Sequence, residues 1–206
     1  MKPGKSLNIW QLAILILAGE SIFFLPFVIA RVFRPTFLSV FDISNLELGV
    51  LYSIYGIIAM AAYFFGGPLA DRFAPRNLLS IALLLTGAGG LFMAFFQNYT
   101  VLSWLYGFWG ITTILLFWAA LIKATRMLGG AEFQGRAFGI LEGGRGFIAA
   151  FASSLAVAVY ALYLPQTDIM ASSIEQQNAF QQVILFFSVW VLVVGLVIWR
   201  FLSIND

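Results

Sequence analysis

The sequence contains no cysteine and no histidine, and only 10% of its 206 residues are charged. Without these two side chains there is no disulfide framework, no imidazole or thiolate ligand for haem or most zinc sites, and no histidine-based nucleophilic pair. The net charge is only +2 and no basic patch stands out, which does not favour nucleic-acid binding. We therefore expect no enzymatic activity, no cofactor, no bound metal and no nucleic-acid partner.

Apolar residues are what the sequence has in abundance. They make up 62% of the chain, and the mean hydropathy is +0.96, whereas a soluble domain carries about a quarter charged residues. A membrane-spanning helix needs about 20 apolar residues. We expect an all-α membrane protein in which residues 1–206 form a single bundle of six transmembrane helices. The expected spans lie at about 9–30, 46–69, 78–96, 101–122, 136–162 and 179–202.

The lysines and arginines at or beyond the ends of these spans indicate an orientation. With a cytoplasmic N-terminus, eight of them fall on the inside and two on the outside, as the positive-inside rule requires. We therefore expect an integral, multi-pass protein of the cell (inner) membrane with both termini in the cytoplasm. The eight are Lys2, Lys5, Arg72, Arg76, Lys123, Arg126, Arg136 and Arg200, and the two are Arg31 and Arg34.

A short polar break after the second span carries a motif. Residues 66–76 read GGPLADRFAPR, and this stretch resembles the loop between the second and third membrane helices of the major facilitator superfamily. The pattern of that loop is G-x-L-a-D-r-x-g-r, from which Ala74 and Pro75 depart. The matching positions are Gly67, Leu69, Asp71, Arg72 and Arg76. The resemblance implies the N-terminal six-helix half of a secondary transporter, with this loop as a gate element whose aspartate engages the opposite half.

The residues of this loop also predict a local structure. Gly67 and Pro68 are expected to end or kink the second helix and to permit a tight turn. Asp71 is expected to accept hydrogen bonds from exposed backbone N–H groups or to pair with Arg72 and Arg76.

Three ionisable residues fall inside the expected spans, where each costs about 2.5 to 3.5 kcal/mol on insertion scales. Glu20 and Arg145 lie at similar depth in spans that both start from the inner side, so they can pair, and Glu142 precedes Arg145 by three residues on one helix. One interpretation is a structural ion pair. The other is a substrate or proton site in a central cavity, with Arg145 holding an anionic group and Glu20 or Glu142 exchanging a proton.

The fifth span is rich in small residues. Residues 132–136, with the sequence EFQGR, are similar to the acidic-then-Gly-Arg entry into the fifth helix of the same family. Gly135, Gly139 and Gly143 recur every four residues, and Gly146 begins a second row, which predicts close helix packing. The glycine-proline pattern of the family's drug antiporters is absent, which disfavours drug efflux. The abundant aromatic residues, Trp118 among them, are assigned no role toward a substrate.

These observations favour a secondary active transporter that moves a small polar or anionic solute by alternating access, as a symporter or antiporter. Its partners are the lipid bilayer, a small-molecule solute, and a missing C-terminal six-helix half or a second chain. Two alternatives stay open. One is a non-transporting membrane scaffold or subunit, and the other is a half-size transporter that works as a dimer.

Overall fold

A computed structural model describes residues 7–164 and 173–204, and it is helical throughout these residues apart from short turns. Lys2 and Lys5, which enter the topology argument, lie outside this range. The helices are α1 (Ile9–Ser21), η1 (Phe24–Val28), α2 (Ile29–Val32), α3 (Arg34–Val40), α4 (Asn45–Arg72), α5 (Pro75–Phe95), α6 (Tyr99–Gly110), η2 (Ile111–Trp118), α7 (Ala119–Gly129), α8 (Gln134–Tyr163) and α9 (Ser173–Phe201).

Six helical segments are long and apolar enough to cross a membrane. The expected all-α membrane fold is thus confirmed, although the ends of several helices differ from the expected ones. The first and fourth segments are composite: α1, η1 and α2 follow one another from Ile9 to Val32, and α6, η2 and α7 from Tyr99 to Gly129. The other four are α4, α5, α8 and α9.

The two composite segments contain π-helical turns, η1 and η2. Pro26 lies in η1 and has no backbone N–H to donate, so the regular α-helical pattern cannot continue there. The Val28 N–H instead reaches back to the Phe23 carbonyl at 3.2 Å. In η2, the Thr113 hydroxyl donates to the Trp109 carbonyl at 2.6 Å. Such π turns occur often at functional sites, and both of these adjoin the charged cluster described below.

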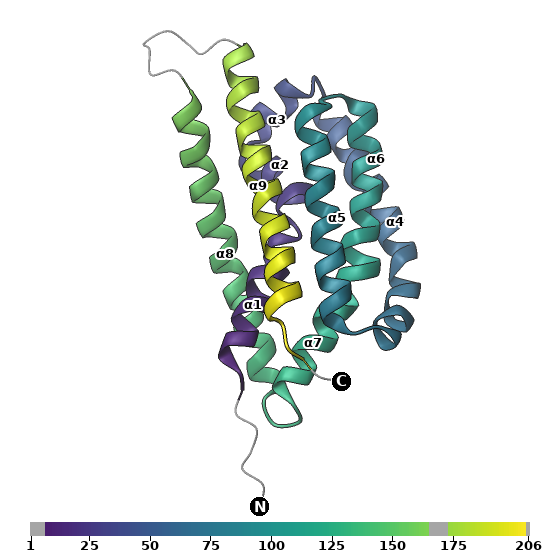
Figure 1. The fold of residues 1–206 in the computed structure, drawn as a ribbon. Helices are drawn as coiled ribbons and strands as arrows, with labels where there is room; N and C mark the ends of the chain where they lie inside the picture. The colour runs from purple at the N-terminus through teal and green to yellow at the C-terminus, as the bar shows by residue number, and fades with distance from the viewer. Residues whose placement is uncertain (1–6, 165–172, 205–206) are drawn as a thin grey trace, which may run out of the picture.

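The ends of the bundle are fixed by contacts between the first and last spans. Gln11 on α1 donates its side-chain amide to the Phe201 carbonyl at 3.1 Å, and the Ser203 N–H donates to the Gln11 side chain at 3.0 Å. The start of α1 and the end of α9 therefore lie at one end of the bundle (Figure 1), where the α7–α8 turn also lies.

The helices differ strongly in how much of them is buried. In Figure 1, α5 and α9 lie side by side in the middle, while α4 and α8 stand at opposite edges. In the most apolar 18-residue stretch of α8, only 11% of the residues are buried, whereas 67% are buried in the corresponding stretch of the first span. The buried residues of α8 are Ala137, Leu141, Ala152 and Ala156, which form a narrow stripe along one side. Most of the surface of α8 is therefore uncovered in this bundle.

Candidate functional site

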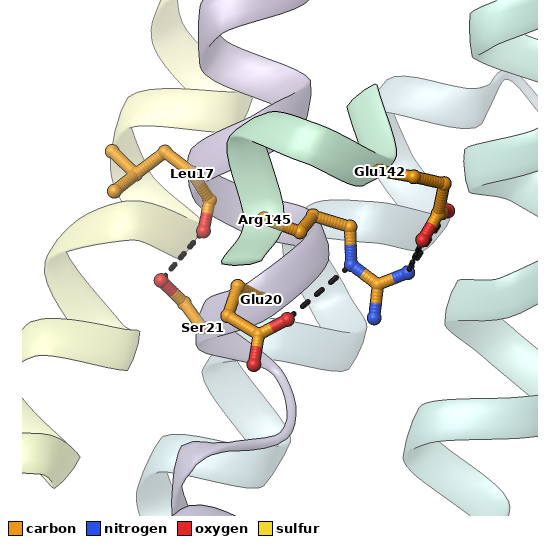
Figure 2. A network of polar contacts seen from close by, with 5 residues as sticks. All are labelled: Leu17, Glu20, Ser21, Glu142 and Arg145. Atoms are coloured by element: carbon orange, nitrogen blue, oxygen red, sulfur yellow. Dashed lines mark hydrogen bonds and ion pairs between the residues drawn. The ribbon is translucent and has the colours of Figure 1, made fainter. Parts of the chain in front are cut away.

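Three charged side chains meet where α1 and α8 pack together. Figure 2 shows Arg145 of α8 lying between the carboxylates of Glu20 and Glu142. Arg145 Nη1 donates to both oxygens of Glu142, at 3.0 and 2.9 Å. Its Nε lies 3.4 Å from Glu20 Oε2, an ion pair between the two helices. All three charges predicted inside the membrane therefore form one cluster.

The cluster lies well inside the bundle. Glu20 follows the first residue of α1 by 11 positions, and Arg145 follows the first residue of α8 by the same number. At 1.5 Å per residue both lie about 16 Å from their helix starts. Arg145 and Glu20 keep only 15% and 14% of their side-chain exposure, whereas Glu142 keeps 59%. Arg145 is thus shared between one buried carboxylate and one that faces out of the bundle.

Glycines allow the two helices to come this close. A Cβ atom on Gly19 would lie 3.2 Å from Arg145 Cδ, and one on Gly144 would lie 2.7 Å from the Ile16 side chain. A larger residue at either position would push α1 away from α8 and lengthen the Glu20–Arg145 distance. Neither glycine stands out in the sequence, because their partners lie on another helix.

Aromatic rings complete the surroundings of Arg145. Its Cζ lies 5.6 Å from the centroid of the Phe23 ring and 5.6 Å from that of Trp118, within the range of cation–π attraction. The two rings also contact each other edge to face, with centroids 6.3 Å apart. Trp118 had been assigned no role from the sequence. One local feature of the sequence did indicate an irregular helix near Glu20, namely Pro26, which lies six residues after it.

The four glycines predicted to pack helices together do not do so in this bundle. Within the described part of the chain, no atom lies within 4 Å of a Cβ placed on Gly135, Gly139, Gly143 or Gly146. They lie on the exposed side of α8, which also carries Glu142. The rotation of α8 about its own axis turns Gly144 inward and its neighbour Gly143 outward, so close packing on these four glycines stays a prediction.

The motif region also differs from the prediction. Gly67 and Pro68 lie inside α4, which continues to Arg72, so the turn follows at Phe73 and Ala74. Proline has no backbone N–H, so Pro68 leaves the Phe64 carbonyl without its usual helical donor, and membrane helices tolerate such a loss. Lys123 Nζ of α7 donates to the Ala70 carbonyl in the last turn of α4 at 3.1 Å, which ties the end of α4 to α7. The helix therefore does not end at Gly67 or Pro68, and it continues past the expected bound at 69 to Arg72.

Within the motif, Leu69 and Arg76 are half-buried, whereas the charged pair that follows Ala70 faces away from the other helices. Asp71 and Arg72 are exposed, and in residues 7–164 and 173–204 Asp71 has neither a hydrogen bond nor an ion pair with Arg72 or Arg76. The expected local pairing is thus not formed. The close contact in this region belongs to Gly66, where a Cβ would lie 3.3 Å from the Ile114 carbonyl oxygen of η2.

Nothing in the described residues resembles a metal centre, since no group of three or more carboxylates gathers there. The arrangement can instead bind an anionic group at Arg145, provided that the Arg145 guanidinium releases Glu142.

The fold and the site together define an integral membrane bundle with a charged cluster midway along its helices. The sequence profile of the Major Facilitator Superfamily matches residues 10–206. The chain therefore belongs to this family of membrane transporters, and the resemblance seen in residues 66–76 is confirmed.

Two curated relatives from Escherichia coli (strain K12) illustrate the match. The chain is 31% identical over 163 residues to "Inner membrane protein YqcE", covering 79% of this chain and 36% of that protein. It is 28% identical over 198 residues to "Inner membrane protein YihN", covering 96% of this chain and 44% of that protein. The chain thus spans less than half the length of these relatives. No solved structure matches it.

Proposed function

We propose that the chain is the N-terminal six-helix half of a secondary active transporter that moves a small polar or anionic solute by alternating access. The other half is a second six-helix unit, on the same polypeptide or on another chain. The protein resides in the inner membrane, as the two relatives do according to their names. The start of α1 and the end of α9 face the cytoplasm.

One observation carries this proposal, the exposure of Glu142. Its side chain is 59% exposed although it lies within a membrane-spanning helix. A charged group in lipid costs about 2.5 to 3.5 kcal/mol on insertion scales, and such groups face a bundle interior or a water-filled cavity. The side of α8 that bears Glu142 therefore faces water or protein rather than lipid, as the wall of a central cavity does.

The exposed glycines support the same assignment. Gly135, Gly139, Gly143 and Gly146 lie on that side of α8 and have no neighbours in the described residues. Small residues let helix backbones approach closely, so this face is suited to a helix of the second half. Asp71, exposed at the end of α4, is free to engage that half as a gate, the role that the motif of residues 66–76 implies.

Transport itself is tested in liposomes with the chain joined to its second six-helix half, which we call the complete assembly. We expect saturable uptake of at least one member of a panel of radiolabelled small carboxylates and phosphate esters. The uptake should exceed that of empty liposomes and depend on Arg145. A folded assembly that moves no member of the panel, with or without an imposed pH gradient, would instead support a membrane scaffold or subunit.

The need for a second half is tested by mass. Light scattering of the purified chain in detergent is compared with its 22.8 kDa. We expect either a dimer, in which a copy of the chain supplies the second half, or a monomer without transport activity of its own. A monomer that moves solute across liposomes unaided would contradict the proposal.

Proton coupling makes a separate prediction. If Glu20 or Glu142 exchanges the coupled proton, Glu20→Gln or Glu142→Gln should make solute uptake insensitive to an imposed pH gradient, because glutamine cannot titrate. Glu132→Gln is the matched control, since Glu132 is exposed in the α7–α8 turn outside the helices. Unaltered pH dependence in both test variants would exclude coupling through these carboxylates.

A further inference from the structure

A small positively charged pocket lies at the C-terminal end of the first span, beyond the cluster of Glu20, Glu142 and Arg145. We call it the outer pocket. It is lined by Phe27, Ala30, Arg31, Arg34 and Tyr52 and has a volume of about 310 Å³. This volume is at the lower end of the range for small-molecule pockets, about 300 to 1,000 Å³. The lining contains two guanidinium groups and no carboxylate.

The two arginines keep most of their donors available. Arg31 is exposed and has no hydrogen bond or ion pair within the described residues. Arg34 uses its Nε to bind the Asn45 side-chain oxygen at 3.0 Å, which fixes the side chain and leaves its two terminal amino groups. The carboxylate nearest in sequence on α4, Glu47, is engaged by the backbone and hydroxyl of Ser44 at the helix start. The positive charge of the pocket is therefore not neutralised by its own lining.

The remaining lining is aromatic and pre-arranged. The rings of Phe27 and Tyr52 are stacked, with centroids 5.6 Å apart and planes at 20°. Tyr52 is in turn held edge to face by the buried ring of Tyr106, 5.7 Å away. A ligand with an anionic group and a small planar or apolar body fits a pocket that offers guanidinium forks beside aromatic rings.

A continuous row of rings joins this pocket to the central cluster. Phe27 lies 6.1 Å from Phe23 between centroids, and Phe23 lies 5.6 Å from the Arg145 Cζ. Phe27 also lines the outer pocket, together with Tyr52, on which its ring is stacked. The cations at Arg31 and Arg34 and the cation at Arg145 thus stand at the two ends of one aromatic wall.

We infer that the pocket at Arg31 and Arg34 is an outer binding site for the anionic group of the solute, a carboxylate or phosphate on a small organic body, before it reaches Arg145. The role in transport rests on the proposed function, but binding does not. The same oxyanion chemistry occurs in the headgroup of an anionic lipid, and the experiment separates the two sources.

The test is calorimetric titration of the purified chain with phenyl phosphate, in uncharged detergent at low salt. We expect saturable binding that Arg31→Gln weakens at least tenfold, because the fork that pairs with the phosphate is lost. Arg31→Lys should weaken it less, because it keeps the charge without the fork. Arg200→Gln at the opposite end of the bundle is the matched control and should leave binding unchanged. Equal affinity in Arg31→Gln and the unmodified chain would overturn the inference.

Two further arms identify the ligand. Phe27→Leu should weaken phenyl phosphate and leave inorganic phosphate unchanged, since only the former uses the ring; equal loss of both would overturn the aromatic part of the site. The titration is then repeated in nanodiscs of phosphatidylcholine with and without phosphatidylglycerol. Displacement of phenyl phosphate by phosphatidylglycerol would assign the pocket to a lipid headgroup and overturn the solute assignment, whereas unchanged binding supports it.

Binding and transport can fail independently. If phenyl phosphate binds through Arg31 while the complete assembly transports nothing, the site stands and the proposed function fails. If an anion is transported and Arg31→Gln changes neither binding nor uptake, the function stands and the site fails.

Discussion

Arg145→Met should reduce anion uptake by the complete assembly at least tenfold and should also destabilise the bundle. The substitution removes the only cation that contacts Glu20 and Glu142 in the described part of the chain. Glu20, which keeps only 14% of its side-chain exposure, then lies unpaired beside apolar helices. Removing one partner of a fully buried pair costs about 3 to 5 kcal/mol, and we expect somewhat less here because the pair is not fully buried.

A double variant separates the two roles of Arg145. Adding Glu20→Gln removes the unpaired charge, so Arg145→Met with Glu20→Gln should recover most of the thermal stability. It should not recover uptake if Arg145 holds the anionic group of the solute. The measurements are thermal unfolding in detergent and uptake into liposomes, with Arg200→Met as the control. Recovery of both stability and uptake in the double variant would make the cluster a structural ion pair only.

Gly110→Val should strongly destabilise the bundle while leaving the charges untouched. A Cβ on Gly110 would lie 2.9 Å from the Tyr55 carbonyl oxygen and 3.3 Å from the Ala59 nitrogen, both backbone atoms of α4. Backbone atoms cannot move aside by changing rotamer, so α4 must separate from the α6–η2 segment. Overpacking costs about 1 to 3 kcal/mol, and we expect the upper end.

Gly56→Val is the matched control for this substitution. Gly56 is also a helical glycine, and the change in helix propensity is the same, but no described atom lies within 4 Å of its Cβ position. Thermal unfolding of the purified chain should therefore show a large decrease in midpoint for Gly110→Val and a small change for Gly56→Val. Equal midpoints for the two variants would mean that α4 does not pack as tightly on this segment as the structure shows.

Membership of the family followed from a short ordered motif, and the number of spans from hydropathy. Both are local properties: an apolar run of about 20 residues must form a helix in lipid, because no water is available for its backbone groups. The equal depth of Glu20 and Arg145 was also predictable, since the rise per residue of a helix is fixed. The C-terminal end of α4 was not, because the helix continues through Pro68 to Arg72, where its last turn is tied to another helix by Lys123 at the Ala70 carbonyl.

By itself the sequence determined that this is a six-helix membrane protein of the major facilitator type with three charges at one depth. Only the tertiary structure decided which side of each helix faces its neighbours. A rotation of α8 by one position would exchange Gly143 and Gly144, and no local pattern fixes that angle because apolar and small residues occur on every side of the helix. The same angle leaves the Glu142 side chain 59% exposed. The π turns η1 and η2 then decided that Phe23 and Trp118 surround Arg145, because side-chain directions after an irregular turn depend on packing rather than on spacing.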